Sequence, residues 1–160
     1  MGKLMLFTDG SVDPGSGKGC GAYLAFEDYE PPVESLVPRV KIVSFDQTSS
    51  TKLELQVLLH VLGELQGFRG KIMIHTDSQN VVELVGRRAR LEAADYLSGR
   101  GKLLNHHDLY RKFYQYIDAL DCELVKVKGH RASYQKDYVE RVFTLVDKAS
   151  RRALRDVLAG

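Results

Sequence analysis

Two stretches of the sequence place an acidic residue directly after an apolar segment with the composition of a β-strand. Residues 4–8 are followed by Asp9, and residues 71–76 are followed by Asp77. In sheets that are flanked by helices, ligands gather at the carboxyl ends of the strands. A single Asp in this position is also a common helix N-cap. Two such endings in one chain favour a shared acidic site in which the two carboxylates lie side by side.

A third acidic residue, Glu54, lies at the start of a predicted helix. Near Thr51 the hydrophobic pattern changes from a period of two to a period of 3.6, and a stripe of leucines follows. Thr51 and Glu54 fit a capping box, in which Glu54 would be structural. Glu54 also lies between Leu53 and Leu55, near the buried face, where a carboxylate needs a cation or a metal to remain charged. Both interpretations are open at this point.

The composition indicates a globular domain and excludes little else. At 160 residues and 18.0 kDa, the chain is expected to form one domain over residues 1–160. The net charge of +2 is too small to indicate a class of partner. Cys20 and Cys122 are far apart and fit neither a disulfide framework nor a zinc site. No apolar run approaches the roughly 20 residues that span a bilayer, and no signal peptide is apparent, so we expect a cytoplasmic protein without membrane contact.

The order of the predicted elements gives the fold class. An α/β fold is expected, with a mixed five-stranded sheet of three antiparallel-type strands followed by two parallel ones, and with helices on both faces. Strands are predicted over residues 3–8, 21–26, 40–45, 71–77 and 123–128, and helices from residue 51 and over residues 78–85, 105–120 and 138–158. Residues 27–38 are expected to be a long hairpin connection, and residues 86–104 a less regular segment that contains a further helix and a glycine-rich loop at residues 99–101.

A set of motifs, taken in order, resembles the ribonuclease H family, type I. No single motif is specific, but together they cover nearly the whole chain in the order and with much of the spacing of that family. They are TDGS at Thr8–Ser11 with a glycine-rich hairpin after it, Thr51-x-Leu53-Glu54-Leu55, TDSQ at Thr76–Gln79, Asp108-Leu109-Tyr110, and Val127-Lys128-Gly129-His130.

The resemblance implies a ribonuclease H-like fold and an endonuclease that hydrolyses the RNA strand of RNA–DNA hybrids, leaving 5′-phosphate and 3′-hydroxyl ends. In the family, the carboxylates matching Asp9, Glu54 and Asp77 join a fourth on the C-terminal helix to hold two Mg²⁺ ions, and Mn²⁺ is a possible substitute. The expected partner is the hybrid itself, bound by a monomer without an obligate protein partner. The alternative is a non-catalytic nucleic-acid-binding module on the same fold.

The fourth acid is where the sequence departs from the family pattern. In the family, the last Asp follows the loop histidine closely, but Asp147 lies seventeen positions after His130, and Phe143 stands where the family has Asn. The alternative ligands are Asp137, which is closer to the family spacing, and Glu140. We nevertheless expect Asp147 to be the ligand, because it lies among the apolar residues that would anchor the last helix to the sheet. The alternative is that Asp147 is an ordinary surface residue of an Arg-rich helix.

The remaining site residues are implied by the resemblance alone. His130 matches the loop histidine that moves protons to or from the attacking water or the product, whereas a lone histidine is otherwise structural or simply exposed. Substrate contacts are implied for Ser11, Ser50 and Gln79, which match positions that touch the sugar–phosphate backbone or the minor groove. A group of basic residues would bind the DNA strand, as the basic handle of the family does; it consists of Arg87, Arg88, Arg90, Arg100 and Lys102. The alternative interpretation is that these residues form a charged surface that contacts only solvent.

Overall fold

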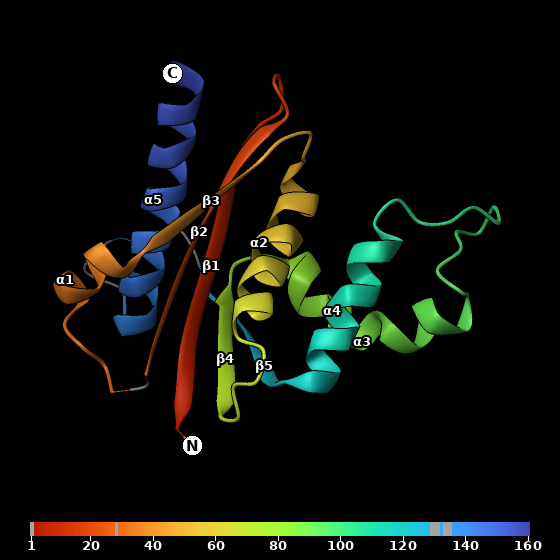
Figure 1. The fold of residues 1–160 in the computed structure, drawn as a ribbon, viewed down its shortest axis with the longest axis horizontal. Helices are drawn as coiled ribbons and strands as arrows, with labels where there is room; N and C mark the ends of the chain where they lie inside the picture. The colour runs from red at the N-terminus through yellow and green to blue at the C-terminus, as the bar shows by residue number, and fades with distance from the viewer. Residues whose placement is uncertain (1, 28, 129–131, 133–135) are drawn as a thin grey trace.

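The computed structural model describes residues 2–27, 29–128, 132 and 136–160. Its elements follow one another in the order drawn in Figure 1. The strands are β1 (Lys3–Asp13), β2 (Lys18–Glu27), β3 (Lys41–Phe45), β4 (Lys71–Thr76) and β5 (Asp121–Lys126). The helices are α1 (Val33–Leu36), the 3₁₀ turn η1 (Val37–Arg39), α2 (Ser50–Glu64), α3 (Gln79–Ala93), α4 (His107–Ala119) and α5 (Tyr138–Ala159).

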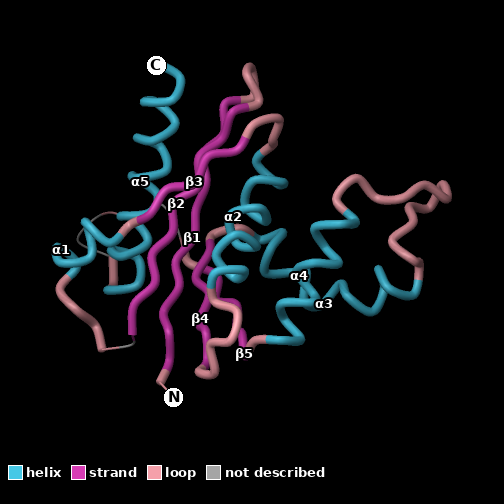
Figure 2. The backbone as a smooth tube through the Cα atoms, viewed as in Figure 1, coloured by secondary structure: helices cyan, strands magenta, loops and turns pink. Residues whose placement is uncertain are grey.

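The strands form a mixed sheet, as the sequence predicts. Within the described residues the sheet has five strands in the order β3-β2-β1-β4-β5. The pairs β1–β2 and β2–β3 are antiparallel, whereas β1–β4 and β4–β5 are parallel. In the ribbon and the tube views, α1 and α5 lie on one face of the sheet and α2, α3 and α4 on the other. Figures 1 and 2 thus show the three-layer arrangement expected from the order of the elements.

Each face of β1 is covered by a different hydrophobic cluster. Leu6 points into a cluster with residues of α2, α3 and α4. Phe7, the next residue, points into a cluster with Val142 and Val146 of α5. Because successive side chains of a strand point to opposite faces, Asp9, two positions after Phe7, belongs to the α5 side of the sheet. The same alternation places Ser11 on that side.

Three glycines let α2 pack directly on the β1–β2 hairpin. A Cβ atom at Gly21 would lie 2.1 Å from a methyl carbon of Val57, and one at Gly10 would lie 2.9 Å from Leu53. A Cβ at Gly19 would similarly meet Leu53 and the Thr48 methyl group. The first turn of α2 therefore approaches β1 beside Asp9, which brings Glu54, the residue after Leu53, to the same end of the sheet.

The hairpin is longer than the sequence predicts. We expected β1 to end at Thr8 and β2 to begin at Gly21, but the antiparallel pairing continues from Asp9↔Ala22 to Asp13↔Lys18. The turn is closed by the Asp13 carboxylate, which accepts hydrogen bonds from the backbone N–H and the hydroxyl of Ser16. Asp9 therefore lies within a strand, although it follows the last residue of β1 that pairs with β4, Phe7.

Several other boundaries also differ from the prediction. Helix α3 runs without a break to Ala93, whereas we expected one helix to end at Val85 and another to follow within residues 86–104. Gly86 is tolerated inside α3 because Leu84 and Leu91 are buried and Arg88 pairs with Glu92 one turn away. Strand β5 spans Asp121–Lys126, not residues 123–128. The segment expected to be a plain connection contains α1 and η1.

We predict that Gly21→Ala destabilises the protein by roughly 1–3 kcal/mol, because the added Cβ meets Val57 in a packed core. Gly86→Ala is the matched control: a Cβ there has no neighbour within 4 Å, so the change should stabilise α3 by about 0.5–1 kcal/mol. Urea unfolding of both variants measures these effects. A Gly21→Ala protein as stable as the parent would contradict the packing described for α2.

Candidate active site

Asp9 and Asp77 lie at corresponding positions of neighbouring parallel strands. Phe7 pairs with His75 in the register of β1 and β4, and each carboxylate lies two residues further along its own chain. Asp77 follows the end of β4, where Ser78 rather than Asp77 caps α3 by accepting a hydrogen bond from the Val81 N–H. The two acids are thus neighbours, and the helix-cap interpretation of Asp77 is not supported.

Asp147 approaches Asp9 from the helix that covers this face of the sheet. The carboxyl group of Asp147 lies close enough to that of Asp9 to raise its pKa. Next to them, the hydroxyls of Ser11 and Ser150 lie 3.0 Å apart, and Ser150 donates to the backbone carbonyl of Asp147 at 3.0 Å. Ser150 is fully buried, so this polar contact fixes α5 along β1 and sets the position of Asp147.

Glu54 is not the capping-box residue that the sequence allowed. Helix α2 begins two residues earlier than Thr51 suggested, because Ser49 is the N-cap and accepts a hydrogen bond from the Lys52 N–H. Glu54 is half-buried, and its carboxylate accepts a hydrogen bond from Ser78, at the start of α3. Glu54 therefore has no capping role. Its position near Asp77 makes it a candidate metal ligand.

Burial and mutual repulsion raise the pKa values of this acidic group. The pKa of Asp9 is raised to about 8, first by burial, then by the negative charge of Asp77 and by the contact with Asp147, while the Gly10 N–H opposes the shift. The pKa of Glu54 is raised by burial and, less strongly, by Asp77, against the hydrogen bond from Ser78. Asp9 is only 7% exposed. Burial and the neighbouring acids therefore disfavour the ionised form of these carboxyl groups, and a bound cation would favour it.

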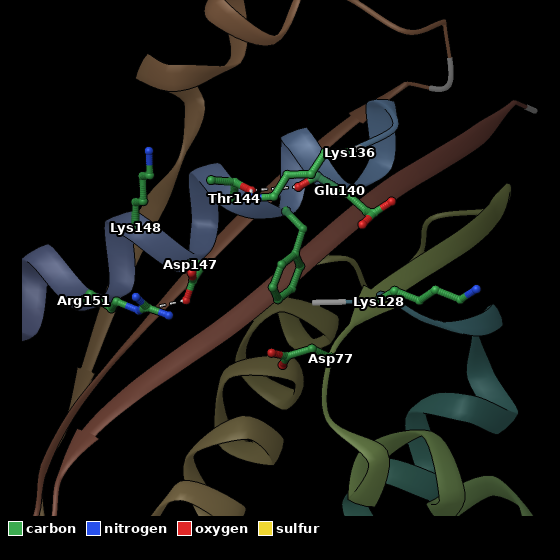
Figure 3. Close-up of a pocket in the computed structure, with 9 residues that line it drawn as sticks. Asp77, Lys128, Lys136, Glu140, Thr144, Asp147, Lys148 and Arg151 are labelled. Atoms are coloured by element: carbon green, nitrogen blue, oxygen red, sulfur yellow. Dashed lines mark hydrogen bonds and ion pairs between the residues drawn. The ribbon is translucent and has the colours of Figure 1, made fainter. Parts of the chain in front are cut away.

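A cavity of about 280 Å³ opens beside the acids. Figure 3 shows Asp77 beyond β4 and Asp147 on α5 facing this space, with basic side chains around it. Both acidic and basic residues line the cavity, which therefore offers oxygen ligands for a metal and cations for a phosphate group. Its lining residues are Asp77, Lys128, Lys136, Glu140, Phe143, Thr144, Asp147, Lys148 and Arg151.

The two alternative candidates for the fourth acid are part of a helix cap. Asp137 is the N-cap of α5 and accepts a hydrogen bond from the Glu140 N–H at 2.8 Å. Glu140 completes the capping box by accepting a bond from the Asp137 N–H at 3.4 Å. Glu140 also lines the cavity, but Asp147 is the residue of α5 that reaches Asp9.

The residues proposed to touch substrate are spread around the site. Ser50 is exposed in the first turn of α2, and Gln79, at the start of α3, donates to Glu83 and accepts a bond from Lys126 at 2.7 Å. Arg87 lies over the Tyr110 ring, 5.8 Å from its centroid. Arg88 binds both carboxylate oxygens of Asp118 at 2.6 and 2.8 Å. His130 lies outside the described residues.

The sequence analysis missed several residues that line the cavity. Arg151 follows Asp147 by four positions, so the helical period, applied to a fixed ligand, would have identified it. Lys148 is the next residue after Asp147, and that spacing does not place it on the same side of a helix. Lys136 donates to the Thr144 hydroxyl at 2.9 Å. It precedes the helix in sequence, in a polar segment without periodicity, so no sequence signal placed it at the site.

The donor set fits hard divalent cations such as Mg²⁺, which prefer carboxylate oxygens and retain several waters. Asp9, Glu54, Asp77 and Asp147 are the residues that would hold them. Among the described residues, no three His, Cys, Asp or Glu side chains already form a ligand cluster. The charge of Asp77 nevertheless contributes to the raised pKa values of both Asp9 and Glu54, which places these three acids near one another. The fit is therefore one of chemistry and position rather than of finished coordination geometry.

Comparison with known proteins identifies the fold and the family. The LC9-RNase H1 structure, described as a type 1 RNase H with the type 2 active-site motif, has a TM-score of 0.70 and 15% identity over 96% of this chain and 72% of that chain. The PFV RNase H domain in solution has a TM-score of 0.68 and 12% identity over 94% and 92%. The native prototype foamy virus protease–reverse transcriptase has a TM-score of 0.69 and 16% identity over 93% of this chain but 20% of its own length.

At these identities, the solved structures establish a ribonuclease H-like fold. No curated protein matches the sequence. A model of the RNase H family matches residues 1–153. The chain therefore belongs to the RNase H family, and family and fold together support a ribonuclease H-type nuclease activity. Among the described residues, no helix is long and apolar enough to cross a membrane.

We predict that the metal-free protein loses stability as the pH rises from about 4 to about 8. A carboxyl whose folded pKa exceeds its unfolded value contributes stability that is complete below the unfolded pKa and is lost as the pH rises through the folded one. For Asp9 this window runs from 3.8 to about 8. Asp9→Asn should flatten the fall of Tm with pH in EDTA, while Asp156→Asn, at an exposed position, should leave it as in the parent. An equal slope for Asp9→Asn and the parent would contradict the shift.

Proposed function

We propose that the protein is a Mg²⁺-dependent endonuclease that cuts the RNA strand of RNA–DNA hybrids and leaves 5′-phosphate and 3′-hydroxyl ends. The observation that carries the proposal is the convergence of Asp9, Glu54, Asp77 and Asp147 from four elements of a ribonuclease H-like fold. When bound, two divalent ions supply an activated water and stabilise the leaving 3′-oxygen; Mn²⁺ is a second candidate ion. A foamy viral protease–reverse transcriptase of the same fold has been solved in complex with an RNA/DNA hybrid, which fits this substrate.

In this proposal the acids hold the cations and the bases hold the substrate. The burial of Asp9 and the packing of α2 and α5 on β1 support a site that is largely formed before substrate arrives, as preorganisation requires. Lys128, Lys136 and Lys148 line the cavity and neutralise phosphate oxygens of the scissile strand. His130 would move a proton at the attacking water or the product. Ser11, next to Ser150, would contact the sugar–phosphate backbone close to the cleaved bond.

The surface formed by the starts of α2 and α3 would hold the hybrid further from the cut. Ser50 and Gln79 would touch the sugar–phosphate backbone or the minor groove, where 2′-hydroxyls distinguish RNA from DNA. Arg87 lines a cavity of about 100 Å³ together with Thr51 and Asn80 and is suited to a DNA phosphate. Arg88 is already held by Asp118 and Glu92, so we assign it to the packing of α3 on α4.

Incubation with a labelled RNA–DNA hybrid, duplex RNA and duplex DNA, with Mg²⁺ and with EDTA, tests the proposed activity. We expect cleavage of the RNA strand of the hybrid with Mg²⁺, none in EDTA and little on either homoduplex. Asp77→Asn is the matched inactive control, because it removes one carboxylate from the group without removing the α3 cap at Ser78. A folded protein that binds the hybrid but leaves it intact with Mg²⁺ and Mn²⁺ would instead be a binding module.

A second experiment tests the assignment of the fourth ligand. Asp147→Asn should lower kcat for hybrid cleavage by at least about a hundredfold, the scale of an electrostatic group at the reacting centre. Asp137→Asn should keep near-normal turnover, because Asn is an equally good N-cap and Asp137 caps α5. Glu140→Gln should also remain active. Normal turnover for Asp147→Asn with loss in either other variant would transfer the ligand role to residues 137–140.

A further inference from the structure

One basic residue of the cavity is bound to a proposed metal ligand rather than only lying near it. Arg151 donates from Nε to the Asp147 carboxylate at 3.1 Å, one helical turn further along α5. Figure 3 shows this ion pair at the edge of the cavity, with Asp77 on the other side. Lys136, by contrast, uses its ammonium group to bind Thr144. The contact between Arg151 and Asp147 therefore places a positive charge on the acid that would receive a cation.

We propose that Arg151 is an internal counter-ion that occupies the Asp147 carboxylate while no metal is bound and is displaced when a divalent cation arrives. This inference rests on the proposed function, because it takes Asp147 as a metal ligand. A carboxylate oxygen that accepts an N–H is engaged at that lone pair, and a guanidinium repels a dication at the same oxygens. Binding of the cation and the Arg151–Asp147 pair are therefore in competition.

The exposure of the two side chains makes the exchange possible. The Arg151 side chain is 56% exposed, against 28% for Asp147. Arg151 can therefore turn into solvent at little cost, whereas Asp147 is held by α5 and by its contact with Asp9. An exposed pair of this kind has the strength of about a two- to fivefold change in a binding constant. The pair is strong enough to set the cation concentration that fills the site and too weak to exclude the cation.

The counter-ion also explains how Asp147 stays directed into the cavity before metal binds. Without a cation, Asp147 lies beside Asp9 and near Asp77, both of which are carboxyl groups. A compensating charge one turn along the same helix lowers the repulsion that would otherwise push the side chain outward. Arg151 is thus a positioning residue, which acts on the metal through Asp147.

Metal titration in the absence of substrate tests this inference. Mg²⁺ and Mn²⁺ binding is measured by isothermal titration calorimetry, and by the rise of Tm over EDTA, for the parent, Arg151→Gln, Arg151→Lys and Arg152→Gln. We expect Arg151→Gln to bind about two- to fivefold more tightly than the parent, and Arg151→Lys, which keeps the charge, to lie closer to the parent. Arg152→Gln is the matched control, since Arg152 is the next residue of α5 and is also exposed, and it should bind as the parent does.

The outcomes separate this inference from the proposed function. In an Asp147→Asn background, Arg151→Gln should cause no further change, because the competing carboxylate is gone. If the parent binds metal and Arg151→Gln binds equally or more weakly, the counter-ion role is overturned while the proposed function stands. Unchanged metal affinity with a raised KM for the hybrid would assign Arg151 to a substrate phosphate instead. A parent that binds neither metal overturns both.

Discussion

Burying a carboxylate beside other carboxylates is unfavourable, and the position of Asp9 in this molecule depends on overcoming that cost. Water no longer solvates Asp9, and the nearest charges, on Asp77 and Asp147, have the same sign, so its pKa rises to about 8. A side chain with freedom to move would turn outward. Asp9 has none, because β1 is paired on both sides up to Phe7 and continues within the hairpin beyond it. The regular sheet thus holds the unfavourable charge in place.

The rest of the architecture delivers the other acids to this point. Parallel pairing of β1 with β4 brings Asp77 level with Asp9. The glycines of the hairpin allow α2 to come close enough for Glu54 to join them. On the opposite face, the buried contact between Ser150 and Ser11 sets the height of α5 along β1. Backbone pairing or core packing thus brings each of these acids to Asp9. Their positions do not depend on the unfavourable interactions among the acids themselves.

Features that depend on periodicity and register could be predicted from the sequence. The fold class, the pairing of Asp9 with Asp77 and the place of Asp147 beside an apolar stripe all came from patterns that the core enforces. It was harder to predict which of two similar local signals sets the boundary of a helix. Ser49 and Thr51 are both good caps, and the selection of Ser49 depends on where α2 meets the hairpin. The continuation of α3 through Gly86 depends on the burial of Leu91, a tertiary contact that the local sequence around Gly86 does not show. Lys136 was beyond prediction, because only the tertiary structure brings it to the cavity.

The departure of this chain from the family spacing has a physical explanation in the start of α5. Asp137 occupies the position nearer to the family pattern, but its carboxylate is already used to cap the helix, and Glu140 reciprocates. A carboxylate that leaves such a cap exposes backbone N–H groups, so its recruitment to a metal would weaken the helix that carries it. Asp147 lies more than two turns after the start of α5, where the backbone groups are hydrogen-bonded within the helix and the side chain has no capping role. Its partner is Arg151, a surface side chain that can be released without loss of structure. An acid held by packing and balanced by a displaceable charge meets the requirements of a metal ligand, whereas one committed to a helix end does not.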